Sequence, residues 1–251
     1  MAKAKKEVVA APSGVVLDER PDWVTETERG SEAISIDDLV IPRIELIQDL
    51  SPQRKANKDE YIEGAETGMA FNTVTKELFD ATIGLSVIPV FFRKEYVIWR
   101  DREMAGGGFH GAFNTELEAV RKLKSGEIES PEQCAVVETD QQFALILNGA
   151  GKWEEAVFSM NISKLKASRQ WNSFIKIRGG DRFSSVYQLK SIEVEGGKGE
   201  YQNWTVKALG YAPEAAFLQA EAVYEAIVSG HKDVSRDTDN NSGEDVADTV
   251  G

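Results

Sequence analysis

Short hydrophobic runs rich in β-branched and aromatic residues fill the middle of the chain, and they predict a mainly β fold. The clearest run is Ala81–Arg102, in which neither alternating face is purely polar over Val87–Phe92. This pattern is typical of a largely buried strand. Pro89 cannot donate a hydrogen bond to a neighbouring strand, so it predicts a sheet edge or a β-bulge. Upstream, we expect an extended entry segment at Ile41–Gln53 and a short strand and turn at Gly68–Thr75.

Two hairpins are expected farther along, because two pairs of strand-like runs each flank a glycine-containing turn. The first turn reads NGAGK (148–152) and the second reads EGGKG (195–199). Such turns between hydrophobic runs are strong hairpin signals. The flanking strands are Gln141–Leu147 with Trp153–Met160, and Ser184–Val194 with Tyr201–Leu209.

Three helices complete the predicted elements. Asn114–Lys124 predicts a short exposed helix capped by Thr115, and apolar spacing predicts a second helix over Asn161–Lys176. A third, Pro213–Ser229, begins with proline and is followed by Gly230. From this order we expect an OB-like Greek-key barrel, the oligonucleotide-binding fold, with an inserted helix and a C-terminal helix.

Composition divides the chain into a core and two tails. Residues 1–38 have almost no apolar periodicity, and residues 231–251 carry six acidic side chains against two basic ones. Neither end can bury enough surface to offset its ordering entropy, so we expect disordered tails, the second of them acidic, around one domain at 39–230. The single Cys134 and the lack of a long apolar run exclude a disulfide framework, a secretory signal and a membrane span. We therefore expect a cytoplasmic protein without membrane contact.

Charge is distributed unevenly along the chain. The formal net charge of −13 opposes a polyanionic partner, because long-range repulsion slows the encounter with phosphates. Between Met160 and Lys190, however, seven cations stand against Asp181 alone, a local surplus of six. A basic surface can therefore coexist with an acidic tail. As a tethered polyanion, that tail is expected to compete with nucleic acid for the surface.

Groups suited to catalysis are few in this sequence. It has only His110, His231 and Cys134 as nitrogen or sulfur ligands, and it shows no metal-ligand spacing, no phosphate-binding glycine loop and no nucleophile elbow. We expect no cofactor and no catalytic role. One alternative is a metal-dependent nuclease that uses Glu193 and Glu195 on the second hairpin. Another is a protein-binding module or inhibitor that acts through its acidic surface.

Aromatic and basic residues occur close together in several segments. Single-stranded nucleic acid requires this combination, because cations contact phosphates and exposed rings stack on bases. Strand alternation places Trp204 in the core and Tyr201 outward, whereas Trp99 and Trp171 are equally compatible with the core and with a ligand surface. The expected phosphate contacts are Arg93, Lys94, Arg100, Lys164, Lys166, Arg169 and Lys176, and the expected stacking residues are Tyr96, Trp99, Trp171 and Tyr201.

Five segments resemble the single-stranded DNA-binding proteins of tailed bacteriophages. They read IPRIELIQDLSPQ (41–53), GMAFNT (68–73), VIPVFFRKEYVIWRDR (87–102) with the GGG that follows, SKLKASRQWNS (163–173) and GEYQNWTV (199–206).

The resemblance implies an oligonucleotide-binding barrel that coats single-stranded DNA with little sequence preference during phage replication and recombination. It also implies a location in the infected host cell and contacts with phage replication proteins through the acidic tail. An oligomer is compatible with it. The last residues, Asp248–Gly251, depart from the aromatic or hydrophobic-proline tip frequent in such tails.

Overall fold

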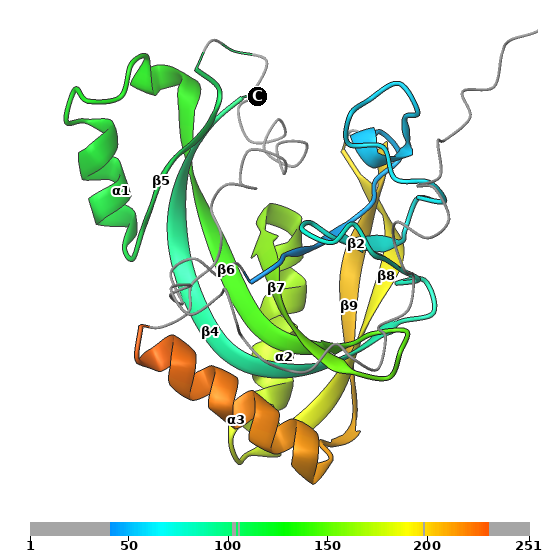
Figure 1. Cartoon of the computed structure of the whole chain (residues 1–251). Coiled ribbons are helices and arrows are strands. Elements are labelled where there is room, and N and C mark those ends of the chain that lie inside the picture. The colour runs from blue at the N-terminus through cyan, green and yellow to red at the C-terminus, as the bar shows by residue number, and fades with distance from the viewer. Residues whose placement is uncertain (1–40, 102–103, 105, 198, 231–251) are drawn as a thin grey trace, which may run out of the picture. The chain divides into compact units, whose positions relative to one another are not determined.

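Strands dominate the part of the chain that the structure, a computed structural model, describes: residues 41–230 apart from 102, 103, 105 and 198 (Figure 1). The expected tails, 1–38 and 231–251, lie outside these described residues. One group of strands comprises β1 (Ile44–Leu46), β2 (Ala70–Asn72) and β3 (Leu78–Phe79). The other comprises β4 (Leu85–Arg100), β5 (Gly108–Phe113), β6 (Cys134–Leu147), β7 (Trp153–Asn161), β8 (Ser185–Gly196) and β9 (Gly199–Tyr211).

These strands form two antiparallel sheets. The smaller sheet has the order β1-β2-β3, and the larger has the order β7-β6-β4-β8-β9 with β5 also paired to β4. The prediction of a mainly β fold is therefore confirmed. Both expected hairpins are also present, because β6 pairs with β7 and β8 pairs with β9.

The helices are α1 (Glu116–Leu123), α2 (Leu165–Arg178) and α3 (Glu214–Val228), which agree with the three expected segments. A 3₁₀ turn at Ile162–Lys164 precedes α2. Thr115 caps α1 as expected: its hydroxyl accepts a hydrogen bond from the Glu118 N–H, while the Glu118 carboxylate accepts one from the Thr115 N–H. Among the described residues, no helix is long and apolar enough to cross a membrane.

Strand β4 is the central strand of the larger sheet. It pairs with β6 on one side from Val87 to Arg100, and on its other side with β8 near its start and with β5 near its end. The register with β6 shifts between Pro89 and Phe91. This irregularity confirms the bulge predicted from Pro89, and it lets a long strand bend within a continuous sheet.

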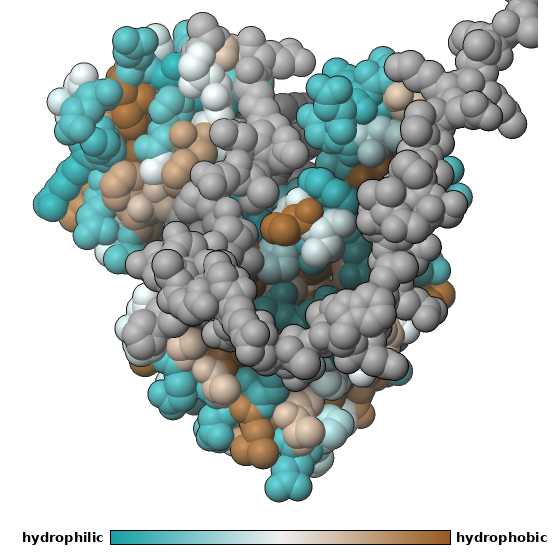
Figure 2. Space-filling model, in the orientation of Figure 1, coloured by the Kyte–Doolittle hydropathy of each residue, from teal (hydrophilic) through white to brown (hydrophobic). Residues whose placement is uncertain are grey.

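Hydrophobic residues cover both faces of the larger sheet. Alternation along β6 sends Ala144 and Ile146 to one face, where they pack with α2 and the smaller sheet. It sends Phe143 and Leu145 to the opposite face, where they pack against α3. Trp204 is buried in the first of these clusters, as predicted. The outer side of α3 is mixed, and Figure 2 shows single hydrophobic residues among hydrophilic ones there.

The smaller sheet reaches the two edge strands of the larger sheet. The Pro42 carbonyl accepts a hydrogen bond from Val157 N on β7, and Gln48 contacts β9 through Gln202. The expected closed Greek-key barrel is not confirmed, because the described strands form two separate sheets with β7 and β9 at the ends of the larger one. Side-chain and single backbone contacts, rather than a continuous ladder, connect the two sheets.

Candidate nucleic-acid interface

Helix α2 presents a stripe of positive charge to solvent. Lys166, Arg169, Ser173 and Lys176 follow one another at spacings of three and four residues, and all four are exposed. Residues at this spacing share one face of a helix. At about 1.5 Å per residue, the distance along the helix from Lys166 to Lys176 is about 15 Å. No acidic residue occurs in α2, so nothing within the helix neutralises Lys166, Arg169 and Lys176, which we call the cationic stripe.

Polar contacts beneath α2 fix the face of the helix that packs on β6 and leave the cationic stripe exposed. Ser168 Oγ donates a hydrogen bond to Asp140 Oδ2 at 2.5 Å and accepts one from Gln142 Nε2 at 2.8 Å. Gln142 Nε2 also lies 3.3 Å from Asn172 Oδ1. Ser168, Asp140 and Gln142 are buried, and a buried polar group is costly when it lacks a partner. This network therefore specifies which face of α2 meets β6.

The apolar part of the same contact is centred on Trp171. Its side chain is 0% exposed, and its ring meets Phe158 and Tyr187 edge-on at centroid distances of 6.2 and 6.1 Å. The sequence was compatible with either a core position or a ligand-binding surface position for Trp171, and the structure places it in the core. A ring enclosed in this way presents no face to a base, so Trp171 acts on the cationic stripe by holding the helix that carries it.

Glu138 on β6 lies between two of the predicted phosphate contacts. Its Oε1 is 2.5 Å from Lys94 Nζ and 3.3 Å from an Arg169 guanidinium nitrogen. The hydrogen bond from Lys94 is the main reason that the pKa of Glu138 lies below its ordinary value, so the carboxylate is ionised at neutral pH. The stabilisation that this shift gives is complete above pH 4.5, the ordinary value, and is lost as the pH falls through the lowered pKa.

We expect Glu138→Gln to increase affinity for nucleic acid while it slightly lowers stability. The change removes one negative charge beside the cationic stripe and frees Lys94 and Arg169 for phosphate. Because the ion pairs are partly exposed, the loss in the free energy of unfolding should be no more than about 1 kcal/mol. Equilibrium titration with a fluorescent oligonucleotide at pH 7, beside urea unfolding, measures both effects. A weaker-binding Glu138→Gln protein with native stability would contradict this role.

The remaining predicted basic residues are less accessible or lie elsewhere. Arg93 is on the face of β4 opposite to Lys94. There its guanidinium lies 5.4 Å from the centre of the Phe143 ring, and its Nε is 2.8 Å from Glu95. Lys164 is partly buried in the 3₁₀ turn before α2. Arg100 is buried. Thus Lys94 meets Arg169 of the cationic stripe at Glu138. Lys164 directly precedes the stripe in the chain, whereas Arg93 and Arg100 lie apart from it.

The predicted stacking residues on β4 also pack within the protein. Trp99 is buried against Val97 and Val137, so it too lies in the core rather than on a ligand-binding surface. Tyr96 was expected at the surface. It is partly buried and packs against the hydrophobic cluster beside α1.

The β8–β9 hairpin carries Tyr201, and the neighbouring Gln202 is hydrogen-bonded to Gln48 of the entry segment. Gln48 Nε2 donates to the Gln202 carbonyl at 2.9 Å, and Gln48 Oε1 accepts from the Gln202 N–H at 2.8 Å. This side-chain amide thus pairs with the edge of β9 as a peptide group would. Tyr201 itself is partly buried, because its ring lies over Gly196, where an added Cβ would be 2.9 Å from Tyr201 Cε1.

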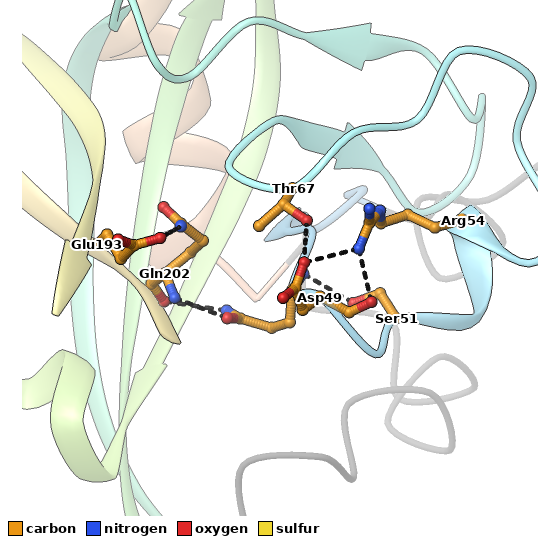
Figure 3. A network of polar contacts seen from close by, with 7 residues as sticks. Asp49, Ser51, Arg54, Thr67, Glu193 and Gln202 are labelled. Carbon is orange, nitrogen blue, oxygen red and sulfur yellow. Dashed lines mark hydrogen bonds and ion pairs between the residues drawn. The ribbon is translucent and has the colours of Figure 1, made fainter. Parts of the chain in front are cut away.

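A second set of contacts orders the loop after Gln48 (Figure 3). Asp49 Oδ1 accepts hydrogen bonds from Thr67 Oγ1 at 2.7 Å and from Arg54 at 2.8 Å. The Thr67 hydroxyl is the main cause that lowers the pKa of Asp49. These groups are satisfied by one another at the surface, and they shape the loop rather than leave a charge for a ligand.

Sequence patterns did not identify one aromatic residue beside α2. Tyr211, at the end of β9, is 73% exposed, and the Arg178 guanidinium lies 4.4 Å from the centre of its ring. Ile177, next to Arg178, is 82% exposed. The strand expected from the sequence ended at Leu209, so alternation assigned no face to Tyr211. An exposed ring and cations therefore meet at the C-terminal end of α2.

Carboxylates suited to a metal are not grouped in the described part of the chain. No group of three or more His, Cys, Asp or Glu side chains that could hold a metal ion occurs among those residues. Glu193 and Glu195 are exposed on β8, and Glu193 accepts a long hydrogen bond of 3.4 Å from Gln202. The nuclease alternative stays an untested prediction.

Comparison with known proteins supports the phage part of the resemblance, while single-stranded DNA binding stays a prediction. The family model described as "Pam3 phage gp34-like protein" matches residues 10–233. No curated protein matches the chain. No solved structure matches it either. Since the matched segment covers most of the 251 residues, the chain belongs to the Pam3 phage gp34-like protein family.

Proposed function

We propose that this protein binds single-stranded DNA with little sequence preference. The observation that carries the proposal is the cationic stripe on α2, which is exposed, free of acidic residues within the helix and about 15 Å long. A stripe of this length can contact several successive phosphates of one strand. Such a surface binds phosphates through charge, and contacts of that kind carry no sequence information.

The exposed ring at the end of the stripe favours a single strand over a duplex. A stacking residue needs a base whose face is open, and bases in a duplex are already stacked on their neighbours. Tyr211 supplies an exposed ring next to Arg178, within reach of a strand that follows α2. Charge and stacking together are the two requirements of single-strand binding.

The overall negative charge does not oppose this proposal. The formal net charge is −13, but six acidic residues lie in 231–251, outside the described residues, and α2 has none. Local potential, rather than net charge, decides where a phosphate binds at short range, because salt screens charges that are more than about 8–10 Å apart. The helix can therefore attract a strand that the whole chain repels weakly.

Titration of the full chain with a fluorescent oligo-dT of about 20 nucleotides tests the proposal. We expect saturable binding at low salt that weakens as salt is added, and weaker binding to a duplex of equal length. A parallel sample with Mg²⁺ should leave the probe intact. Absence of binding at low salt would refute the proposal, and Mg²⁺-dependent cleavage of the probe would replace it with the nuclease alternative.

Removal of residues 231–251 should strengthen binding to oligo-dT. The segment is a polyanion by sequence, and a competitor that is tethered to the same chain acts at high effective concentration. We expect a gain of several-fold at low salt that shrinks at high salt, where the competition is screened. Equal affinities of the full and shortened chains at low salt would contradict competition by the tail while leaving DNA binding intact.

The broader role that we propose follows from the phage family and the ligand. A phage protein that coats single strands would protect DNA during replication and recombination in the cytoplasm of the host cell, and its acidic tail would contact phage replication proteins. In this proposal the larger sheet, with the smaller sheet extending between β7 and β9, serves as an OB-like scaffold. Its supports are the contacts of Pro42 with β7 and of Gln48 with β9.

A further inference from the structure

Two arginines at the C-terminal end of α2 form no ion pair with the described residues. Arg178 is the last residue of α2, and Arg182 begins the 3₁₀ turn Arg182–Ser184 after Gly179 and Gly180. Among the described residues, neither guanidinium forms an ion pair within 4.0 Å of an acidic group. Arg182 is nevertheless partly buried, and its burial lowers its pKa to about 10. The buried Asp140 carboxylate acts on Arg182 only from beyond ion-pair distance, so the guanidinium can still receive an anionic ligand.

Aromatic rings and amides hold both guanidinium groups in place. Arg178 lies 4.4 Å from the centre of the Tyr211 ring, and Arg182 lies 5.5 Å from that of Phe92. The Nη2 of Arg182 donates to Asn172 Oδ1 at 2.9 Å and also to Gln142 Oε1. These amide oxygens orient Arg182 without neutralising its charge. Planar guanidinium groups fixed in this way bind the oxygens of a phosphate with little loss of side-chain entropy.

The two arginines are both tied to the C-terminal half of α2. Arg178 is the last residue of the helix, and Arg182 donates a hydrogen bond to Asn172 within the same helix. Burial raises the pKa of the Tyr187 hydroxyl, and the charges of both arginines oppose that rise. The Tyr211 ring flanks Arg178 on the solvent side and is 73% exposed.

We infer that Arg178, Arg182 and Tyr211 form a nucleotide subsite, in which the arginines hold one phosphate of a single strand and Tyr211 stacks on an adjacent base. The inference rests on the proposed function and adds a defined position to it. The cationic stripe supplies contacts along the backbone, whereas this subsite binds a phosphate and a base together. A carboxylate peptide would use the arginines but would have no need of the exposed ring.

Matched oligonucleotides separate the two parts of the subsite. The probes are oligo-dT and an oligonucleotide of equal length that carries abasic sites, so the second keeps the phosphates and lacks the bases. Tyr211→Ala should weaken binding to oligo-dT about tenfold, because one stacked base contributes roughly 1–3 kcal/mol, and it should leave the abasic probe unaffected. Arg178→Ala should weaken binding to both probes.

Tyr61→Ala is the matched control, because Tyr61 is also an exposed tyrosine and lies far from Tyr211 along the chain, in the segment between β1 and β2. It should bind both probes as the native chain does. A photoreactive 5-iodouracil in the oligonucleotide should cross-link to Tyr211, which peptide mass spectrometry identifies. Thermal unfolding of each variant verifies that the fold is retained, as expected because Tyr211 and Tyr61 are exposed and Arg178 is only partly buried.

The outcomes distinguish the subsite from the proposed function. If the native chain binds oligo-dT but either Tyr211→Ala or Arg178→Ala binds it unchanged, the subsite is refuted and DNA binding stands. A cross-link that maps only to other residues leads to the same conclusion. If the native chain binds neither probe at low salt, both the proposed function and the subsite fail.

Discussion

Replacing Trp171 with alanine is expected to lower the free energy of unfolding by about 3–5 kcal/mol, the range for removing a large aromatic side chain from a packed core. The ring is 0% exposed and meets Phe158 and Tyr187 edge-on. Its loss would leave a cavity between α2 and the larger sheet, which the rigid strands cannot fill. Urea unfolding followed by circular dichroism measures the change.

Trp171→Phe is the companion variant, because it keeps an aromatic ring and leaves a smaller cavity. It should lose less stability than Trp171→Ala and should bind oligo-dT with almost native affinity. The contrary result would be native stability combined with a large loss of affinity in both variants. That pattern would mean that Trp171 contacts the ligand directly, as one of the two sequence-based interpretations held.

Removing the cationic stripe should cause the largest loss of affinity. With Lys166, Arg169 and Lys176 all replaced by alanine, three phosphate contacts disappear. Each phosphate contact with a single strand contributes about −0.7 to the slope of log affinity against log salt. Three contacts therefore raise the affinity of the native chain roughly a hundredfold when salt falls from about 1 M to about 0.1 M, and the triple variant should lack this gain. All three side chains are exposed, and the fold should therefore be retained. Oligo-dT titration of the native and triple-variant chains measures the difference.

The matched control removes exposed cations from another helix. Arg121 and Lys124 lie in and just after α1, and both are exposed. Arg121→Ala with Lys124→Ala should change affinity much less than the α2 triple variant does. If the two sets of substitutions have equal effects per charge, binding would depend on net charge alone and the stripe would have no special role.

Local sequence signals predicted much of the fold. Pro89 indicated the irregularity in β4, and Thr115 indicated the start of α1, because missing donors and capping side chains act on their immediate neighbours. Alternation placed Trp204 in the core. Strand β5 was not predicted, since its short sequence GFHGAF contains two glycines and has weak β propensity.

Contacts between distant segments account for what the sequence did not predict. The choice between core and surface for Trp171 depends on which face of α2 meets β6, and the bond from Ser168 to Asp140 that sets this face spans 28 positions. The contact between Arg178 and Tyr211 is likewise long-range, because β8 and most of β9 lie between the two residues in the sequence. Strand alternation likewise cannot tell whether two edge strands close into a barrel, because closure depends on the curvature of the whole sheet.

The slope of oligo-dT affinity against salt, compared between the full chain and its Lys166, Arg169 and Lys176 triple-alanine variant, tests single-strand binding by α2 most directly. We predict that the native plot of log affinity against log salt is steeper by about two, the value for three phosphate contacts at roughly 0.7 each. Equal slopes for the two proteins, or no binding by the native chain at low salt, would contradict it.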